Sequence, residues 1–574
     1  MMNKKKIINL LETIALYMEL KGENPFKISA FRKAALALEQ DERSFSEIED
    51  FTKISGIGKS TAVIIQNFIE TGGESEELDL LKKEVPEGLV PLLKVPGLGG
   101  KKLSRLYQEL GVVDKDSLLA KAEDGSISAL KGFGQKSVDK MVEAVQEMGD
   151  RPDRYPLNDV LPVAKKLEDY LAGIKEIERF SHAGSFRRLR ETVKDLDFVI
   201  ATSNPEAVAK QLLAIETIDQ VIAAGDTKVS VELDDGIKIS VDFRMVAPGE
   251  FVSTLHHFTG SKNHNIRMRQ IAKQQSEKIN EYGVEDEAGN VKQFDSEEAF
   301  FKHFNIPFLP PEVRRDGTEI DRISKDTAFV QLADIKGDLH MHTTWSDGAY
   351  SLSEMVEACI AKGYEYMVIT DHGQFLKVAN GLTEERIRKQ QEEIRALNAQ
   401  YAEIEILSGI EMDILPDGSL DFDDSLLQDL DFVIASIHSS FSQSEEEIMK
   451  RLRTACENPY VHLVAHPTGR VIGRRDGYNV NVEALIELAA ETGTALELNA
   501  NPQRLDLTAK YLELAKERDV PIAINTDAHD TKHLDFMEIG VRAATKGWLA
   551  KENVLNTRSK ADFLAFIKNK RSAK

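Results

Sequence analysis

Histidines and carboxylates recur at the ends of apolar segments in the last part of the sequence. The segment GDLHMH ends with two histidines one residue apart. The segments YMVITDH, FVIASIH, VHLVAHP and IAINTDAH each have a histidine at or next to their end. Candidate metal ligands at or near these ends are His340, His342, Asp347, His372, Glu411, His438, His466, Asp527 and His529. So many mixed donors exceed the needs of one zinc ion and suit two or three ions of Zn²⁺, Mn²⁺ or Fe²⁺. Such centres activate water and bind phosphate, so the pattern predicts phosphoester hydrolysis.

Any one of these histidines alone is more often structural, and the prediction depends on their joint placement. His462 and His533 fall outside the strand-end pattern and are assigned to packing or to the surface. Arg470, Arg474 and Arg475 follow the motif AHPTG and are candidates to hold a substrate backbone, with a solvated loop as the alternative.

A second set of carboxylates lies in the segments DLDFVIAT and ISVDFRMV. Asp195 and Asp197 are two residues apart on a predicted strand, so both side chains project from one face. Asp242 lies on another predicted strand that can pair beside them. Neighbouring carboxylates repel unless a divalent cation neutralises them, and oxygen ligands suit Mg²⁺ or Mn²⁺. Two such ions can activate a 3′ hydroxyl and stabilise a departing pyrophosphate.

The motif GSFRR lies just before these aspartates. Ser185, Arg187 and Arg188 at this glycine turn offer a hydroxyl and two guanidinium groups to a triphosphate. A lone Asp-x-Asp is usually a solvated strand end. The turn, the arginines and the third aspartate together favour metal-dependent nucleotidyl transfer.

Different elements must hold the two sets. Residues 335–574 alternate apolar strand-like segments with helical patterns, which is typical of a parallel sheet or barrel whose C-terminal strand ends gather the site. β-branched segments predict strands over residues 155–260. Residues 261–318 are mixed and end in the proline-rich stretch IPFLPPEVRRDG.

Residues 1–150 have apolar side chains at helical spacing and a weak internal repeat. The stretches ISGIG and VPGLG share one form, each is followed by a predicted helix, and LKGFGQKS is a looser copy. This is the helix-hairpin-helix pattern, whose glycines allow backbone N–H groups to face a DNA phosphate. It assigns Gly56, Gly58, Gly97 and Gly99 to DNA binding. An ordinary turn between two helices is the alternative for a single copy.

Composition limits the classes of partner. The net charge of −23 argues against a general polyanion-binding surface, so nucleic-acid contacts must be local. Two cysteines give no disulfide framework and suit a reducing cytosol. The sequence has no run of eighteen apolar residues, so we expect no membrane span and a cytoplasmic protein.

The stretch up to about residue 318 resembles the family X DNA polymerases, the polymerase-beta class. The resemblance lies in GSFRR, DLD, VDFR, HHFTGSKNHNIRMR and the two helix-hairpin-helix turns. It implies that Asp195, Asp197 and Asp242 bind the catalytic metals, and that Asp242 is the base for the primer hydroxyl. It implies nucleotide contacts for Ser185, Arg188, His257, Phe258, Gly260 and Asn265. It implies a template-strand contact for Arg269.

The sequence also departs from that family's pattern. Lys194 replaces a small residue, and its ammonium can add triphosphate affinity; His257 stands where vertebrate relatives carry tyrosine. Those relatives use a lysine as a Schiff-base nucleophile, whereas the aligned position here is Ile64, so we expect little or no lyase activity. Lys27 and Lys33 remain suited to binding a 5′ phosphate at a gap.

The last part resembles the polymerase and histidinol phosphatase (PHP) domain through HMHTTWSDG, TDH, SIHSS, AHPTGR and NTDAH. The resemblance implies a Mn²⁺-dependent 3′–5′ exonuclease, with processing of blocked 3′ ends or cutting at abasic sites as further activities.

We therefore expect a multidomain protein with an all-α helix-hairpin-helix N-terminal region, an α+β nucleotidyltransferase palm and thumb, and a distorted (β/α)7 PHP barrel. The expected divisions are 1–85 (helical, DNA-binding), 86–150 (fingers-like), 151–260 (palm), 261–318 (thumb-like), 319–334 (linker) and 335–574 (PHP).

The expected function is gap filling in DNA repair by a family X polymerase with an attached exonuclease. Expected partners are gapped or primer-template DNA and deoxynucleoside triphosphates, and we expect a monomer with Mg²⁺ or Mn²⁺ in the palm and two or three Zn²⁺, Mn²⁺ or Fe²⁺ ions in the PHP part. One alternative is a PHP phosphoesterase with a DNA-binding but inactive polymerase region. Another is a DNA-end scaffold with two decayed sites.

Overall fold

The computed structural model describes residues 4–40, 48, 50–93, 95, 98–146 and 152–572. The chain divides into two compact units, Met1–Pro152 and Asp153–Lys574. Within the described residues, no helix combines the length and the apolar character needed to cross a bilayer.

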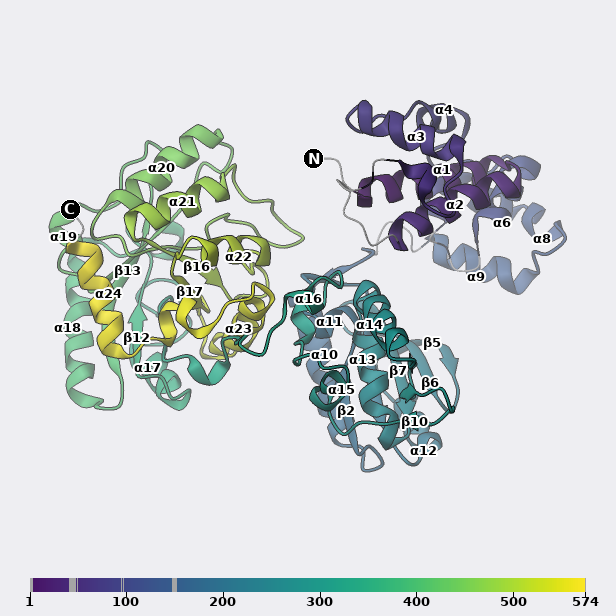
Figure 1. Ribbon diagram of the computed structural model, residues 1–574. Helices are drawn as coiled ribbons and strands as arrows, with labels where there is room; N and C mark the ends of the chain where they lie inside the picture. The colour runs from purple at the N-terminus through teal and green to yellow at the C-terminus, as the bar shows by residue number, and fades with distance from the viewer. Residues whose placement is uncertain are drawn as a thin grey trace. The chain divides into compact units, whose positions relative to one another are not determined.

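The first unit is helical around one apolar core, shown in purple and blue in Figure 1. Its principal helices are α1 (Lys4–Lys21), α2 (Pro25–Gln40), α3 (Lys59–Glu70), α4 (Glu76–Glu84), α6 (Gly100–Leu110), α7 (Lys115–Glu123) and α9 (Gln135–Gln146). Side chains cap several of them: Ser75 accepts from the backbone of α4, and Asp114 forms a capping box on α7. By contrast, α3 and α6 begin after Gly58 and Gly99, which supply no side-chain cap.

The second unit begins with a five-stranded sheet in the order β2-β4-β7-β6-β5. Its strands are β2 (Arg179–His182), β4 (Asp195–Ala201), β5 (Ile218–Ala224), β6 (Lys228–Asp234) and β7 (Lys238–Val246). Strands β4 and β7 pair in parallel, and the other neighbours pair antiparallel. Residues of β7 alternate between buried and half-buried, so one face packs on the core while the other remains available for polar residues.

Helices and a small sheet follow this palm. They are α13 (Phe251–Thr259), α14 (Lys262–Gln274), α15 (Glu297–His303) and a three-stranded sheet of β8 (Lys278–Ile279), β9 (Val284–Glu285) and β10 (Val291–Lys292). Buried phenylalanines, including Phe300 and Phe301, form the core of this thumb-like part. Trp548, from far along the chain, joins the same apolar cluster.

The rest of the second unit is a seven-stranded parallel sheet whose order follows the sequence. The strands are β11 (Gly337–Asp338), β12 (Tyr366–Ile369), β13 (Glu405–Asp413), β14 (Phe432–Ser436), β15 (Leu463–Val464), β16 (Ala495–Asn499) and β17 (Ile522–Asn525). The His342 N–H donates to the Ala528 carbonyl at 2.8 Å, which joins the two ends of the sheet. The predicted (β/α)7 fold is confirmed as a nearly closed barrel.

Helices lie between and around these strands (Figure 1). They are α17 (Leu352–Ala361), α18 (Glu384–Gln400), α20 (Glu445–Glu457), α21 (Val482–Thr492), α22 (Ala509–Glu517), α23 (Phe536–Lys546) and α24 (Lys560–Ser572). One cluster of buried apolar residues includes both palm and barrel side chains. The palm and barrel therefore share a packed core.

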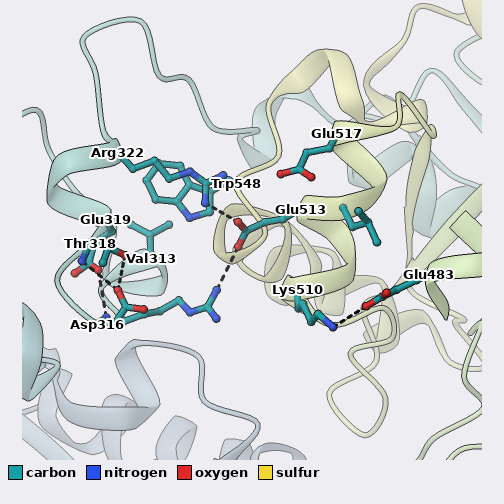
Figure 2. A pocket seen from close by; sticks show the side chains of 12 residues that line it. Val313, Asp316, Thr318, Glu319, Arg322, Glu483, Lys510, Glu513, Glu517 and Trp548 are labelled. Atoms are coloured by element: carbon teal, nitrogen blue, oxygen red, sulfur yellow. Dashed lines mark hydrogen bonds and ion pairs between the residues drawn. The ribbon is translucent and has the colours of Figure 1, made fainter. Parts of the chain in front are cut away.

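A polar junction connects the end of the thumb-like part to the barrel. Arg315 and Arg322, the latter in α16 (Glu319–Arg322), lie 3.2 and 2.5 Å from the two carboxylate oxygens of Glu513. The Arg322 guanidinium also packs over Trp548, as Figure 2 shows. These residues line a pocket of about 480 Å³ whose third cation, Lys510, pairs with Glu483. Since each of the three cations already pairs with a carboxylate, we assign no ligand to the pocket.

Candidate active sites

The palm brings the three aspartates together through strand register. Asp197 of β4 lies directly opposite Asp242 of the parallel strand β7, and Asp195 shares the face of Asp197. Burial, followed by the charges of Asp195 and Asp242, raises the pKa of Asp197 to about 7. A divalent cation relieves this kind of repulsion, so the donor set fits a metal ion.

Two residues that the sequence analysis did not select hold Asp242. The Ser230 hydroxyl donates to Asp242 Oδ1 at 2.6 Å, and the Lys228 ammonium lies 2.8 Å from Oδ2. Both come from β6, where their spacing of two puts them on one face. The alternating pattern in KVSVEL is the sequence feature from which Lys228 and Ser230 could have been predicted to share a face.

The glycine turn packs directly against the aspartates. Gly184 has φ +59°, and a Cβ there would lie 1.9 Å from Asp197 Oδ2, so only glycine fits. Ser185 follows with a buried Oγ that has no hydrogen-bond partner among the described residues. Arg188 donates to the carbonyls of Gly184 and Thr259, and burial lowers its pKa to about 10. Ser185 and Arg188 therefore lie beside the carboxylates.

Arg187, which the sequence suggested for triphosphate binding, makes its contacts with the thumb-like part. Its guanidinium lies 2.5 Å from Glu297 Oε2 and donates to the Thr259 hydroxyl at 2.7 Å. Glu297 also accepts from Arg314 at 2.8 Å. Arg187 therefore connects the palm to the thumb-like part.

The residues proposed to surround the nucleotide base and sugar lie on α13 and α14. Asn265 Nδ2 donates to the His257 carbonyl at 2.8 Å, and Arg244 packs over the Phe258 ring at 4.3 Å. Burial and then the charge of Arg269 lower the pKa of His257. Gly260 has φ +64° and lies against Arg188, so this segment adjoins the triphosphate turn, whereas Lys194 is exposed beside β4.

The helix-hairpin-helix glycines occupy the starts of helices in the first unit. Gly56 has φ +106°, and Gly58 and Gly99 immediately precede α3 and α6. A Cβ at Gly58 or Gly99 would meet nothing within 4 Å in the described part of the chain, so both face open space. Gly97 lies outside the described residues. Lys27 is exposed and 3.6 Å from Glu23, and Ile64, on α3, is half-buried.

The barrel gathers all nine candidate ligands at the C-terminal ends of its strands. Glu411 of β13 is at the centre: its oxygens lie 2.9 Å from His466 Nε2, 3.0 Å from His372 Nδ1 and 3.3 Å from both His340 Nε2 and His438 Nε2. Asp527 lies 3.2 Å from His342, and Asp347 lies 3.5 Å from His529.

Among the described residues, three groups of these side chains could each hold a metal ion. They are His342, Asp347, His372 and His529; His340, His342 and Asp527; and His372, Glu411 and His438. Nitrogens of His340, His342, His372 and His466 are buried with no hydrogen-bond partner in the described structure. Imidazole nitrogens and carboxylate oxygens that face one another without a hydrogen bond between them are suited to bind a metal ion. Burial and then neighbouring His529 and His372 lower the pKa of His342 to about 3, which keeps it neutral, as a ligand must be.

A second layer of buried carboxylates supports the ligands. Glu497 Oε1 lies 2.7 Å from His340 Nδ1, and Glu497 Oε2 accepts from the His466 backbone N–H at 2.7 Å. Asp413 Oδ2 lies 3.2 Å from His438 Nδ1. Such partners fix the orientation of metal-binding imidazoles. Glu497 lies on β16, a strand that supplies none of the nine predicted ligands.

The arginines near the barrel site differ in what they contact: one lies beside a candidate ligand, and the others contact other parts of the chain. Arg504 Nε lies 3.6 Å from Asp527 Oδ2, so it is the cation beside the ligands. Arg470 instead pairs with Glu191 of the palm, and Arg475 donates to the Gly469 carbonyl. Outside the ligand set, His462 is buried against Phe432 and accepts from the Val433 N–H.

Comparison with known proteins agrees with this division. Family models match as "Helix-hairpin-helix domain" over residues 2–74, "SAM-like Helix-hairpin-helix tandem" over 48–112 and 89–147, "DNA polymerase beta thumb" over 254–315, and "PHP domain" over 338–527. "DNA polymerase/3'-5' exonuclease PolX" of Bacillus subtilis (strain 168) is 58% identical over 568 residues, which cover 99% of this chain and 100% of that protein. The chain belongs to the PolX family of family X DNA polymerases with a PHP domain.

Shorter relatives of this PolX chain match only part of it. A "Probable phosphatase" of Thermoanaerobacter sp. (strain X514) is 29% identical over 234 residues, 38% of this chain and 89% of that protein. A "Probable phosphatase" of Acetivibrio thermocellus is 29% identical over 243 residues, 41% of this chain and 95% of that protein.

Proposed function

We propose that this PolX chain fills short DNA gaps at its palm and removes nucleotides from 3′ ends at its barrel. The carrying observation is that one chain holds both a three-carboxylate palm with its glycine turn and the nine-ligand ring. Identity of 58% to PolX of Bacillus subtilis over nearly the whole chain supports the same pair of activities.

In the palm, Asp195, Asp197 and Asp242 would hold Mg²⁺ or Mn²⁺, which would supply the positive charge for nucleotidyl transfer. Asp242 accepts the proton of the primer 3′ hydroxyl, after its contact with Lys228 opens. Ser185 and Arg188 bind the triphosphate, and Lys194 adds a further cation. His257, Phe258 and Gly260 lie along the incoming sugar, while Asn265 contacts the base.

In the barrel, the nine ligands would hold two or three Zn²⁺, Mn²⁺ or Fe²⁺ ions, which would supply the activation of water and the neutralisation of phosphate charge. Water adds to the terminal phosphodiester, and the bond from phosphorus to the 3′ oxygen of the preceding nucleotide breaks. That oxygen takes up a proton released by the water, and a nucleoside 5′-monophosphate leaves. Arg504, beside Asp527, is placed to hold a phosphate oxygen. Mn²⁺ is the ion we expect to support this reaction.

The partners are gapped or primer-template DNA and deoxynucleoside triphosphates. We propose that Gly56, Gly58, Gly97 and Gly99 contact DNA phosphates through backbone N–H groups, that Lys27 binds a 5′ phosphate and that Arg269 contacts the template. The protein acts as a cytoplasmic monomer, with domain boundaries at the divisions expected above.

A primer assay tests both activities together. A 5′-labelled primer on a one-nucleotide-gapped duplex is incubated with Mg²⁺ or Mn²⁺, with and without nucleotides. We expect lengthening with nucleotides and shortening without them. Asp195→Ala with Asp197→Ala removes only lengthening, and His340→Ala with His342→Ala removes only shortening. Asp235→Ala, which removes a half-buried carboxylate paired with Lys166, is the control.

Two results contradict the proposal. If the primer never lengthens, the palm only binds DNA and the phosphoesterase alternative holds. If it lengthens but never shortens, the barrel acts on another phosphoester, and small phosphomonoesters become the next substrates to assay.

A further inference from the structure

The barrel helix α23 reaches the polymerase turn that carries the candidate triphosphate residues. Arg542 Nη2 donates to the Arg187 carbonyl at 2.7 Å, and its Nε donates to Glu312 Oε1 at 2.7 Å. One guanidinium thus holds the palm turn and the end of the thumb-like part together. Its planar fork provides both donors without a change of position.

One helical turn later, Lys546 makes a second contact with the same segment. Its Nζ donates to the Leu189 carbonyl at 2.8 Å. Leu189 is buried and has φ +50°, a backbone conformation that leucine rarely adopts. Lys546 is half-buried, and burial lowers its pKa to about 8.

Arg542 and Lys546 bind backbone carbonyls of the segment 184–191, which also packs against a palm carboxylate. Gly184 packs on Asp197 at one end, and Glu191 pairs with Arg470 of the barrel at the other. Between them lie Ser185 and Arg188. The carbonyls of Arg187 and Leu189, one on each side of Arg188, accept hydrogen bonds from α23.

Stability alone explains the lysine poorly. Lys546 donates to a neutral carbonyl, and the Glu191 charge that also acts on it is already paired with Arg470. Withdrawing an ammonium from water for these contacts is unfavourable compared with an apolar side chain of similar volume. A directional donor is useful when a backbone must be held in one conformation, as in a site that binds a triphosphate. Small displacements of such groups cost large factors in rate, on the order of 100-fold for about 1 Å.

We propose that Arg542 and Lys546 of the PHP barrel are positioning residues for nucleotide binding at the polymerase site, because they fix the turn that presents Ser185 and Arg188. The inference rests on the proposed polymerase function. It makes the barrel part of the polymerase apparatus in addition to its own hydrolytic role.

The test compares Lys546→Met and Arg542→Met with wild type in steady-state gap filling by the full chain. We expect KM for the incoming nucleotide to rise about tenfold in each, with kcat changed less than about threefold. Lys560→Met is the matched control, because Lys560 pairs with Glu405 within the barrel. A labelled nucleotide titrated onto protein with gapped DNA and a dideoxy-terminated primer should show the same weakening without turnover.

Degradation of single-stranded DNA monitors the barrel in every variant and should stay within about twofold of wild type. If wild type fails to extend primers, the proposed function itself fails. If wild type extends them and both variants keep its KM and nucleotide affinity, this inference is wrong. Where a methionine variant does not fold, Arg542→Lys decides: it keeps the charge but loses the second arm, so a wild-type KM overturns the proposal.

Discussion

Arg470 of the barrel and Glu191 of the palm form a two-armed ion pair, with Nη2 3.0 Å from Oε1 and Nη1 3.2 Å from Oε2. Arg470 follows the candidate ligand His466 by four residues, and Glu191 follows the nucleotide-turn residue Arg188 by three. Bidentate geometry fixes direction as well as distance. The pair therefore joins the loops of the two candidate sites.

Lys228 occupies an oxygen of Asp242 that a metal ion needs. We expect Lys228→Met to tighten Mn²⁺ binding at the palm by up to about fivefold, since a half-exposed ion pair is worth about 1 kcal/mol. Titration of Mn²⁺ followed by electron paramagnetic resonance measures this directly, in a background of His340→Ala and His342→Ala that weakens the barrel site. Lys166→Met is the control, and unchanged affinity in Lys228→Met would exclude competition.

Glu497 orients His340 and the His466 backbone, so its loss should loosen the barrel metals. Glu497→Gln is expected to lower metal affinity about 10- to 100-fold. Metal retained after dialysis, measured by mass spectrometry, should fall together with 3′–5′ degradation, while primer extension persists. Glu405→Gln, on the exposed start of β13, should retain the metals. Full retention in Glu497→Gln would show that His340 needs no such partner.

Glu297 stabilises the contact between palm and thumb-like part in a pH-dependent way. Burial alone would raise its pKa, but Arg314 and Arg187 hold the pKa at about 2, below the ordinary 4.5. A depressed carboxyl pKa stabilises the fold above pH 4.5, and this contribution is lost as the pH falls towards 2. Glu297→Gln should cost about 3 kcal/mol at neutral pH, because it leaves Arg314 without a buried counter-charge.

The melting temperature of the second unit, followed by circular dichroism, measures that contribution. The difference between wild type and Glu297→Gln should be constant above about pH 5 and shrink steadily below it. A difference that stays the same at pH 3 would assign the effect to packing instead of charge.

Substitutions at Gly58 and Gly99, where α3 and α6 begin, should affect DNA binding without affecting folding. Gly58 and Gly99 have φ of −79° and −73°, which any residue adopts, and a Cβ there meets no described atom within 4 Å. Gly58→Val and Gly99→Val should therefore keep the melting temperature but block backbone approach to phosphate. We expect about tenfold weaker binding of gapped DNA for each, by fluorescence anisotropy, from the loss of one hydrogen-bonded contact. Normal binding by the double variant would exclude these turns from the interface.

Much of this architecture could be predicted because local patterns determine it. Alternation with a period of two put Asp195 and Asp197 on one face, and the parallel pairing of β4 and β7 brings Asp242 alongside. Apolar segments ending in histidine predicted the barrel, because parallel strands end at one rim. The fold class and family membership are confirmed.

The features that could not be predicted from the sequence depend on contacts between segments that are far apart in the chain. Glu497 looks like an isolated polar residue in an apolar strand until its contact with His340 is known. Arg187 appeared suited to a triphosphate, but the structure pairs it with Glu297, over a hundred residues away. Composition and periodicity carry no information about such partners, or about the pairing of Arg470 and Arg474 with Glu191 and Asp159 of the palm.

The contacts of α23 with the nucleotide turn have an evolutionary consequence. Two enzymes joined by a loose tether can diversify separately, because a substitution in one leaves the other untouched. Here, a change at Arg542 or Lys546 alters the surroundings of Arg187 and Leu189 in the polymerase. With the proposed positioning role, selection on nucleotide use would act on an outer helix of the PHP barrel, and halves exchanged between lineages would have to match at these contacts.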